Sequence, residues 1–445
     1  MNVGTELMED LALSLVEEMA GWLAAKPEMG ALALENALRE AMRELGRICL
    51  QAALEAVQER YPQAAVECPC GHRAQYMFQR EAKTLSVFGW VSYKRAYYLC
   101  SHCHKGQSPF DHEWGLRPGQ VSVALASLLG LEGIEAAFEK ASSKLEKRLL
   151  IEVSENTVRK ETQAFGELVQ QQEEEQWVES QDEKNLFARR RTIPDPPQRL
   201  YGSMDGVQVP IGEEWRELKC GCWYTVDGEG YGEEVGETGR LRAQEISYYC
   251  DVAGAGDFRD LVWATGYGRH ADVAQEVVFV ADGAAWIWKI VKYHFPHAVQ
   301  IVDWYHALEY LGHIAQVRFE DESQRERWLE RATAALWEGE IEQTIAICRE
   351  HEEHALAGPL VRKAITYYRN NAERMDYARF RQEGYQIGSG TVESACKQIG
   401  TQRLKCAGAR WSERGARLTA KARAAWLSDD WEPLEQRCFA LAQAA

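Results

Sequence analysis

The chain has 445 residues, of which 46% are hydrophobic and 27% charged, a composition typical of globular proteins with two or three cores. Its formal net charge of −17 argues against nucleic acid as a partner when taken alone, although a local basic surface can coexist with an acidic remainder. No apolar run approaches the roughly 20 residues of a membrane span. The acidic N-terminus also lacks the basic start of a signal peptide, so we expect a cytoplasmic protein.

Residues 1–60 are predicted to be helical, because apolar residues recur at helical spacing between charged ones, at Leu34, Leu38, Leu45 and Ile48. Pro27 is expected to divide this region into two pieces. Two interpretations stay open for it: a helical hairpin packed on the next domain, or a dimerisation element.

Residues 61–118 are predicted to form a zinc-ribbon-like β-hairpin. A run rich in β-branched and aromatic residues, with Gly89 at its turn, lies between two cysteine pairs, Cys68 with Cys70 and Cys100 with Cys103. Four thiolates give zinc a closed tetrahedral site, which indicates a structural and not a catalytic ion.

The first cysteine pair is one residue shorter than the usual C-x-x-C spacing. Free cysteines packed in the hairpin therefore remain the alternative. His72, His102 and His104 lie nearby in the sequence and could substitute as ligands. Twelve cysteines in so long a chain indicate reduced thiols or a metal site, not a disulfide scaffold.

Residues 119–175 resemble a helix-turn-helix in their pattern. A helix is followed by a short turn and by Ser154, a predicted N-cap. The second helix carries Thr157, Arg159 and Lys160 near its start, so DNA binding is one interpretation and plain helical packing is the other. Residues 176–199 change from acidic to basic to proline-rich without an apolar period, which predicts a linker.

The pattern after Arg199 is that of a mixed α/β sheet. Residues 200–306 contain three strand-like runs and then two units in which an apolar strand leads into a helix. Asp205 lies in the first strand-like run, whereas Asp282 and Asp303 follow the last two strands. Ligands of such sheets bind at strand ends, so these carboxylates are candidate site residues.

The rest of the chain returns to helices before the α/β pattern resumes. Residues 307–385 read as an inserted helical domain, and residues 386–428 bring back a glycine-rich turn in which Glu393 opens a helix. Residues 429–445 are predicted to be a C-terminal tail.

Three carboxylates, Asp205, Asp282 and Glu393, stand in apolar or glycine-rich surroundings. Brought together, they could bind two Mg²⁺ or Mn²⁺ ions, which prefer hard oxygen ligands. Two such ions about 4 Å apart act on the attacking and leaving oxygens of a phosphodiester displacement. Any one of these carboxylates taken alone could equally be a solvated surface residue, since the chain has 68 Asp and Glu residues.

Six segments of the chain closely resemble bacterial insertion-sequence transposases of the ISKra type: MDGVQVP, WRELKCGCWY, VADGAAWIWK, HFPHAVQIVDWYHALEYL, GSGTVESACK and RLKCAGARWSERGA. The cysteine-rich segment is similar to theirs as well. The resemblance implies a DDE enzyme with a ribonuclease H-like fold that cleaves and transfers DNA strands at the ends of an insertion sequence. It implies Asp205 and Asp282 as the two aspartates and Glu393 as the glutamate. Its implied partners are double-stranded DNA and further copies of the chain.

Asp303 and His306 resemble a D-x-x-H signature found after the second aspartate in related transposase families. Asp303 competes with Asp282 as a metal ligand, because it also follows an apolar strand. The alternative is that Asp303 caps the following helix and pairs with His306, which leaves His306 a supporting or DNA-contact role. The tryptophans Trp286, Trp288 and Trp304 are predicted to lie in the core, with base stacking by Trp304 as the alternative.

A run of cations follows Glu393 and is predicted to form a basic helix: Lys397, Arg403, Lys405, Arg410, Arg414, Arg417, Lys421 and Arg423. Lys397, Arg403, Lys405 and Arg410 are the expected phosphate contacts, because cations along a DNA backbone release counterions. A solvated basic helix is the alternative. Two other functions stay open: a ribonuclease H-like nuclease or resolvase without strand transfer, and a domesticated, non-catalytic DNA-binding protein.

Overall fold

The computed structural model describes residues 13–14, 16–18, 20–22, 25, 30–61, 64–228, 230–231, 235 and 241–444. The predicted break at Pro27 lies outside the described residues, as do the first twelve residues of the N-terminal helical region. The chain divides into two compact units. The N-terminal unit comprises Met1–Glu132, Phe138–Glu161 and Glu435–Ala445, and the C-terminal unit comprises Gly133–Ala137 and Thr162–Leu434.

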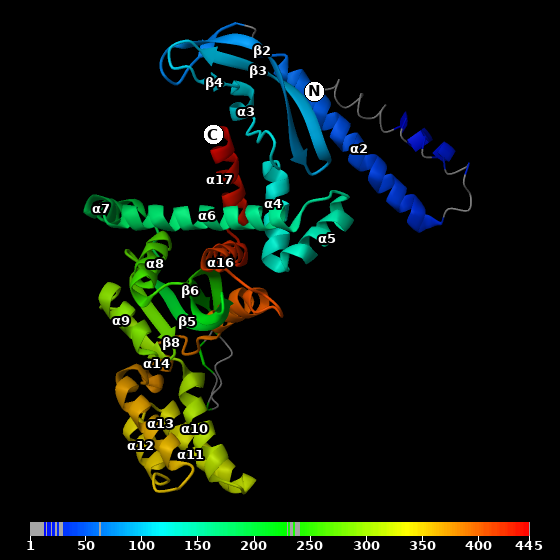
Figure 1. Cartoon of the computed structure of the whole chain (residues 1–445). Helices are drawn as coiled ribbons and strands as arrows, with labels where there is room; N and C mark the ends of the chain where they lie inside the picture. The colour runs from blue at the N-terminus through cyan, green and yellow to red at the C-terminus, as the bar shows by residue number, and fades with distance from the viewer. Residues whose placement is uncertain are drawn as a thin grey trace. The chain divides into compact units, whose positions relative to one another are not determined.

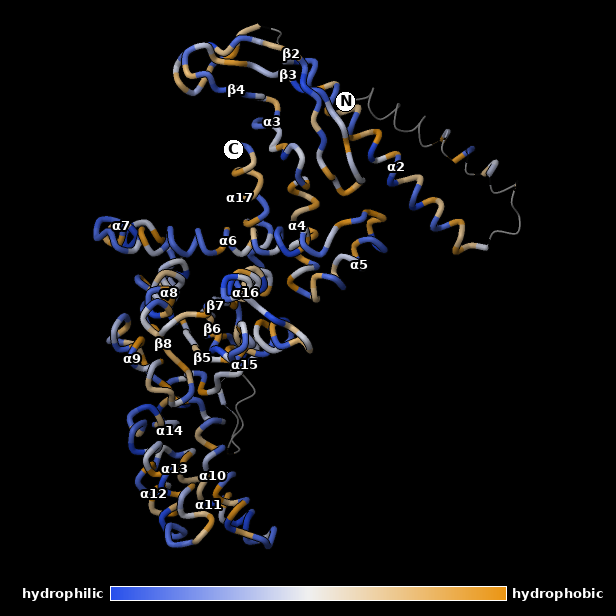
Figure 2. Tube along the Cα trace, in the orientation of Figure 1, coloured by the Kyte–Doolittle hydropathy of each residue, from blue (hydrophilic) through white to orange (hydrophobic). Residues whose placement is uncertain are grey.

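The N-terminal unit contains a long helix and a four-stranded antiparallel sheet. Helix α2 (Ala31–Gln58) alternates apolar and polar residues along its length (Figure 2) and packs on the sheet (Figure 1). The strands are ordered β1 (Val66–Glu67), β2 (Arg73–Ser86), β3 (Gly89–Cys100) and β4 (Gly106–Gln107). Leu54 of α2 meets Val91, Tyr93 and Phe110 in one buried cluster. The predicted hairpin is confirmed.

Five helices bring the chain from this hairpin to the second sheet: α3 (Pro109–Glu113), α4 (Val123–Glu135), α5 (Phe138–Leu149), α6 (Glu155–Ser180) and α7 (Glu183–Thr192). The hydroxyl of Ser154 accepts a hydrogen bond from the backbone N–H of Thr157 at 3.1 Å, so α6 begins at the predicted cap. Arg159 and Lys160 are exposed on its first turns.

The linker predicted at 176–199 is instead largely helical, formed by the end of α6 and by α7. None of the described side chains of α7 is buried, so this helix has no apolar face, and its sequence therefore shows no helical period. The predicted tail at 429–445 likewise contains a helix, α17 (Trp431–Ala444), in which Trp431 and Leu434 are buried.

The C-terminal unit is built on a five-stranded mixed sheet (Figure 1), with the order β7-β6-β5-β8-β9. Strands β5 (Arg199–Ile211), β6 (Glu214–Asp227) and β7 (Arg242–Asp251) are antiparallel, whereas β8 (Glu276–Ala281) and β9 (Val299–Val302) run parallel to β5. Helix α8 (Ala255–Gly268) connects β7 to β8, and α9 (Ala285–His294) connects β8 to β9. The predicted order of three strands followed by two strand–helix units is confirmed.

A helical insertion follows β9, as the sequence predicts. It comprises α10 (Trp304–Arg318), α11 (Glu322–Trp337), α12 (Ile341–Arg349), α13 (Gly358–Asn371), the 3-10 helix η1 (Ala372–Arg374) and α14 (Tyr377–Gln382). Helices α10 to α13 pack successively against one another, and α13 returns to contact α10 (Figure 1). Trp304 is fully buried in contact with Trp337 and Tyr377, so it is a core residue and offers no free face to a base.

The predicted basic helix is two elements. Helix α15 (Gly390–Ala395) continues into the π-helix η2 (Cys396–Leu404), and α16 (Glu413–Leu427) begins only after a turn in which Gly408 has a φ of 77°. Gly400 of η2 packs on β5, since a Cβ there would lie 2.4 Å from the side chain of Val207. No helix among the described residues combines the length and apolar character that a membrane crossing requires.

Most cations of α16 bond to groups within the C-terminal unit. Lys421 is 1% exposed and pairs with Glu173 of α6 and with Asp251, the latter at 3.3 Å. Burial alone would lower the pKa of Lys421, but these two carboxylates raise it, so the amine stays charged. Arg423 is also buried and donates to backbone carbonyls. Lys421 and Arg423 of the predicted basic run are therefore packing residues and are not exposed to DNA.

We predict that Lys421→Ala will lower the free energy of unfolding by about 3 kcal/mol or more, because it leaves the buried carboxylate of Glu173 without its partner. The matched control is Arg414→Ala, which breaks an exposed ion pair between the same two helices, to Glu167, and should cost about 1 kcal/mol or less. Urea unfolding followed by tryptophan fluorescence measures both changes. Equal losses would contradict the buried pair as a determinant of this packing.

Candidate metal centre

Three aspartates of the C-terminal unit lie in one row across three neighbouring strands. The parallel register pairs each β5 residue with the β8 residue 77 positions later, up to Gly202 with Phe279. It pairs each β8 residue with the β9 residue 21 positions later, up to Ala281 with Val302. Continuing both registers aligns Asp205 with Asp282 and Asp282 with Asp303. Sequence analysis grouped Asp205 and Asp282 with Glu393 and named Asp303 as a competitor of Asp282, but it did not predict that the three aspartates share one row.

Glu393 lies on the short helix α15, which follows the helical insertion in the sequence. Its carboxylate Oε1 lies 3.9 Å from Nδ1 of His306, which stands on the first turn of α10. Val392 and Ala395 are buried beside it and hold α15 in place, while the Glu393 side chain itself is 49% exposed. Glu393 is therefore a half-exposed carboxylate on a firmly packed helix.

Asp303 connects the two halves of the site. It is fully buried, and its Oδ1 accepts a hydrogen bond from the backbone N–H of His306 at 2.7 Å, which caps α10. The same oxygen lies 3.1 Å from Nδ1 of the His306 ring. The other oxygen, Oδ2, accepts from the backbone N–H of Ser389, the residue before α15. The capping alternative for Asp303 is thus confirmed.

Ser389 was missed by sequence analysis, although the Gly-Ser-Gly segment that contains it was noted as the entry to the Glu393 helix. Its contribution is a backbone N–H, so its side-chain chemistry carried no signal. Only its position next to the start of α15 connects it to the site.

The carboxylates influence one another electrostatically. Burial raises the pKa of Asp282, and the negative charges of Asp205 and Asp303 raise it further. Burial also raises the pKa of Glu393, followed by the charge of Asp303. These shifts mean that the folded metal-free protein disfavours both charges, which a bound cation would relieve.

Asp303 and His306 show the opposite behaviour. Burial acts to raise the pKa of Asp303, but hydrogen bonds from His306 and Ser389 outweigh it and lower the pKa. The hydrogen bond to Asp303 raises the pKa of His306 to about 9, so the imidazole is protonated at neutral pH. These two residues form an internal ion pair.

Two sets of residues in this region could hold a metal. The candidate ligand atoms of Asp303, His306 and Glu393 all lie within 4.8 Å of one another, whereas Asp205 and Asp282 are not part of that group. Asp303, however, already accepts hydrogen bonds on both of its oxygens, and a protonated His306 is not a ligand. For Asp205 and Asp282, Oδ1 accepts the backbone N–H of Gly206 and of Ala284, respectively. No hydrogen bond to the Oδ2 atoms is among those found for the described residues.

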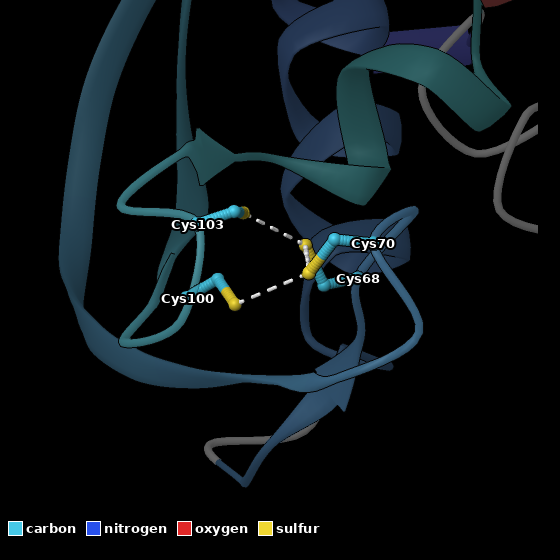
Figure 3. A group of neighbouring side chains, drawn as sticks. All are labelled: Cys68, Cys70, Cys100 and Cys103. Carbon is cyan, nitrogen blue, oxygen red and sulfur yellow. Dashed lines mark hydrogen bonds between the residues drawn. The ribbon is translucent and has the colours of Figure 1, made fainter.

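A second candidate metal group lies in the N-terminal unit. The sulfur atoms of the four predicted cysteines face one another (Figure 3), with Cys70 3.4 Å from Cys68 and 3.7 Å from Cys100, and Cys68 3.6 Å from Cys103. His72 lies beside them, its Nδ1 3.6 Å from the Cys70 sulfur, and its ring stacks on His102. His104 is not part of either cysteine-containing group.

The six predicted DNA-contact residues differ in accessibility. Lys397, Lys405, Arg410, Arg159 and Lys160 are exposed. Arg403 is 2% exposed, its Nε donates to the carbonyl of Gly133 at 2.9 Å, and burial lowers its pKa to about 10. Arg403 is therefore a packing residue in this structure, and the expectation that it contacts phosphate is corrected.

We predict opposite stability effects from two isosteric changes in the metal-free protein at neutral pH. Asp282→Asn should raise the free energy of unfolding, because it removes a charge that the fold disfavours. Asp303→Asn should lower it by about 2 kcal/mol, because it weakens the acceptor of three hydrogen bonds. Since the pKa of Asp303 is lowered, its contribution is present above the ordinary aspartate pKa and is lost as pH falls. Urea unfolding measures both, and a destabilising Asp282→Asn would contradict the electrostatic description.

The chain is similar to one protein family over part of its length. The model of the Uncharacterised protein family (UPF0236) matches residues 262–432. This range begins within α8 and ends at the start of α17, so it includes Asp282, Asp303 and Glu393 but not Asp205. No curated protein matches the chain.

Proposed function

We propose that this chain is a DDE transposase that cleaves DNA and transfers strands at the ends of an insertion sequence, with a ribonuclease H-like catalytic domain in its C-terminal unit. The observation that carries the proposal is the row of Asp205, Asp282 and Asp303 across three strands, with Glu393 brought beside it by α15. Its other support is the resemblance of six segments to the ISKra-type transposases.

The sheet also supports the fold part of this proposal. Three antiparallel strands are followed by two parallel strands with a helix between them, and a helical insertion separates the last strand from the helix that carries Glu393. The carboxylates thus come from rigid elements, which suits a site that must hold a reacting group in place.

Asp205, Asp282 and Glu393 are the residues that would hold two Mg²⁺ or Mn²⁺ ions. Bound there, the ions would polarise a phosphodiester and lower the pKa of the attacking water or 3′-hydroxyl. The donor set fits, since these are hard oxygen ligands and two of the three carboxylates have raised pKa values that a cation would relieve. Asp303 acts as a positioning residue, because it fixes both His306 and the start of α15.

Double-stranded DNA is the proposed partner, bound by several copies of the chain, and the proposed location is the bacterial cytoplasm, at the nucleoid when the protein is on DNA. The exposed cations Lys397, Lys405 and Arg410 follow the Glu393 helix in the sequence and are candidates for phosphate contacts. Arg159 and Lys160 are exposed at the start of α6 and could contact element ends.

A nuclease or resolvase would use the same carboxylates but would release cut DNA without joining it to a target. A non-catalytic descendant would bind DNA without cutting it. Incubation of the protein with Mg²⁺ and DNA that flanks its own gene separates the three functions, since only a transposase gives joined products.

We predict that Asp205→Asn, Asp282→Asn and Glu393→Gln will each abolish cleavage while DNA binding survives. Each change removes a metal-binding charge and preserves the shape of the side chain. Cleavage is measured on labelled element ends in Mg²⁺ and Mn²⁺, and binding by mobility shift. Full cleavage by any one variant would remove that residue from the proposed triad.

Asp303→Asn is the matched comparison for this series. As a positioning residue, Asp303 should reduce cleavage when changed, without the complete loss seen for the metal-binding carboxylates, once the assay temperature is lowered to keep the variant folded. If Asp303→Asn is inactive while folded and Asp282→Asn is active, then Asp303 is the second catalytic aspartate.

We propose further that the cysteine cluster of the N-terminal unit holds one structural Zn²⁺ through Cys68, Cys70, Cys100 and Cys103. The short sulfur–sulfur distances support this, because four sulfur atoms within reach of one another could surround a single ion.

We predict one zinc per chain in protein purified without chelator, measured by elemental analysis. Cys100→Ser should lose the zinc and lower the melting temperature, because metal binding and folding of the hairpin are coupled. Cys49→Ser is the control, since Cys49 is a free cysteine outside the cluster and its change should alter neither quantity. Zinc-free wild-type protein with a native melting temperature would refute the proposal.

A further inference from the structure

A basic groove opens directly beside Asp282. It has a volume of about 710 Å³ and is lined by Gly283 and by residues of α9, α10, α13 and η1. Tyr367 of α13 packs so closely on Gly283 that a Cβ there would lie 2.2 Å from its ring. One wall of the groove therefore packs against the residue that follows Asp282, a proposed metal-binding carboxylate.

The groove carries positive charge in a chain whose net charge is −17. Its cations are Lys289, Lys292, Arg362, Lys363 and Arg374. None of the described residues that line it is an aspartate or glutamate. None of the five cations is among the ion pairs found in the described part of the chain. Unlike the cations of α16, these five are therefore not neutralised within the protein.

Two hydrogen-bond donors of the groove have no partner. The indole Nε1 of Trp288 and the hydroxyl of Tyr367 are buried atoms without a hydrogen bond among the described residues. An unpartnered buried donor is unfavourable, and one in a binding site indicates a ligand that would satisfy it. Long basic side chains cover this region, with Arg374 over the ring of Trp288 and Lys363 over that of Tyr310. Arg374 also donates hydrogen bonds to Gln300, Asn370 and Asn371, so a phosphate at Trp288 would have to draw its guanidinium away from these acceptors.

The two observations together describe a site for a polyanion. Uncompensated lysine and arginine side chains attract phosphates and release their counterions. Neutral N–H and O–H donors then fix individual phosphate oxygens in place. The rings of Tyr310 and Tyr367, which both line the groove, stack with centroids 4.2 Å apart.

We propose that this groove binds the phosphate backbone of duplex DNA on one side of the bond to be cleaved, with Trp288 and Tyr367 donating to phosphate oxygens. This rests on the proposed function, because it takes the DNA-cleaving site to be that of Asp205, Asp282 and Glu393. The proposal assigns DNA contacts to particular residues of α9 and of the helical insertion. The resemblance assigns no such contacts to them.

The first test replaces Lys289, Lys292 and Lys363 by Ala together and measures binding of a labelled random-sequence DNA duplex across a range of KCl concentrations, without divalent cations. The slope of log affinity against log salt should flatten by up to about 3 units, since each phosphate contact adds about 0.9. The control replaces Lys184, Arg191 and Arg327, three exposed cations of the same unit that do not line the groove. Equal changes in slope for the two triple variants would overturn the proposal.

The second test separates DNA contact from structural support. Tyr367→Phe removes the unpartnered hydroxyl, so it should weaken duplex binding about fivefold without lowering the melting temperature. Tyr293→Phe, which changes an exposed tyrosine outside the groove, should alter neither. A Tyr367→Phe variant that melts earlier and binds normally would show a structural role and count against the proposal.

The cleavage assay distinguishes failure of the groove from failure of the proposed function. If the parent protein cleaves element ends and the groove variants keep the parent salt slope, the groove proposal is wrong and the transposase proposal stands. If no DNA is cleaved in Mg²⁺ or Mn²⁺ but the slope of log affinity against log salt is still flatter for the groove variants, the groove binds DNA and the proposed chemistry is wrong.

Discussion

The carboxylate of Asp303 is the interaction on which the candidate site depends. It joins the end of β9 and the start of α10 to Ser389, 86 positions later in the chain. Everything between these two segments belongs to the helical insertion, so the insertion leaves the sheet and returns to it at this one buried residue. The backbone N–H of Trp304 donates a hydrogen bond to the carbonyl of Ile387 at 2.9 Å and closes the same junction. This closure adds to the packing of α15 on β5 and β6 and fixes the residue from which the Glu393 helix starts.

The charges at the site follow from this arrangement. A buried aspartate is tolerated when it is satisfied by hydrogen bonds and by an opposite charge, and Asp303 has both. Asp282 has neither in comparable measure, which leaves it with a raised pKa next to two further carboxylates. One aspartate of the row is therefore neutralised by the protein itself, whereas the fold supplies no such partner for Asp282.

Much of this architecture could be predicted from the sequence because it is encoded locally. The strands of the mixed sheet, the cysteine hairpin and the Ser154 cap each depend on residues close together in the chain, and all were predicted. Helices α7 and α17 were not: α7 buries none of its described side chains, and the buried residues of α17, Trp431 and Leu434, lie in its first turn. The common row of Asp205, Asp282 and Asp303 depends on strand register, which no local pattern specifies.

The basic residues that follow Glu393 show most clearly that contacts between distant segments cannot be predicted from a local pattern. Lys421, Arg423 and Arg403 look like a DNA-binding surface in the sequence, yet each is buried and bonded within the protein. Apart from the Gln398 carbonyl that accepts from Arg423, their acidic or carbonyl partners lie more than 160 positions earlier, so sequence neighbours could not reveal the pairing. A count of basic residues therefore overestimates the charge that the end of the chain presents to a polyanion.

The lysines and arginines of α9 and of the helical insertion show the reverse. They form no basic run in the sequence, but α9, α13 and η1 place five of them around one groove with no carboxylate among its described lining residues. An acidic protein can bind DNA locally if folding neutralises some of its cations and groups the others in one place. If the groove binds DNA as proposed, the acidic remainder of the protein would repel DNA elsewhere on the surface and so favour binding at the groove over nonspecific binding.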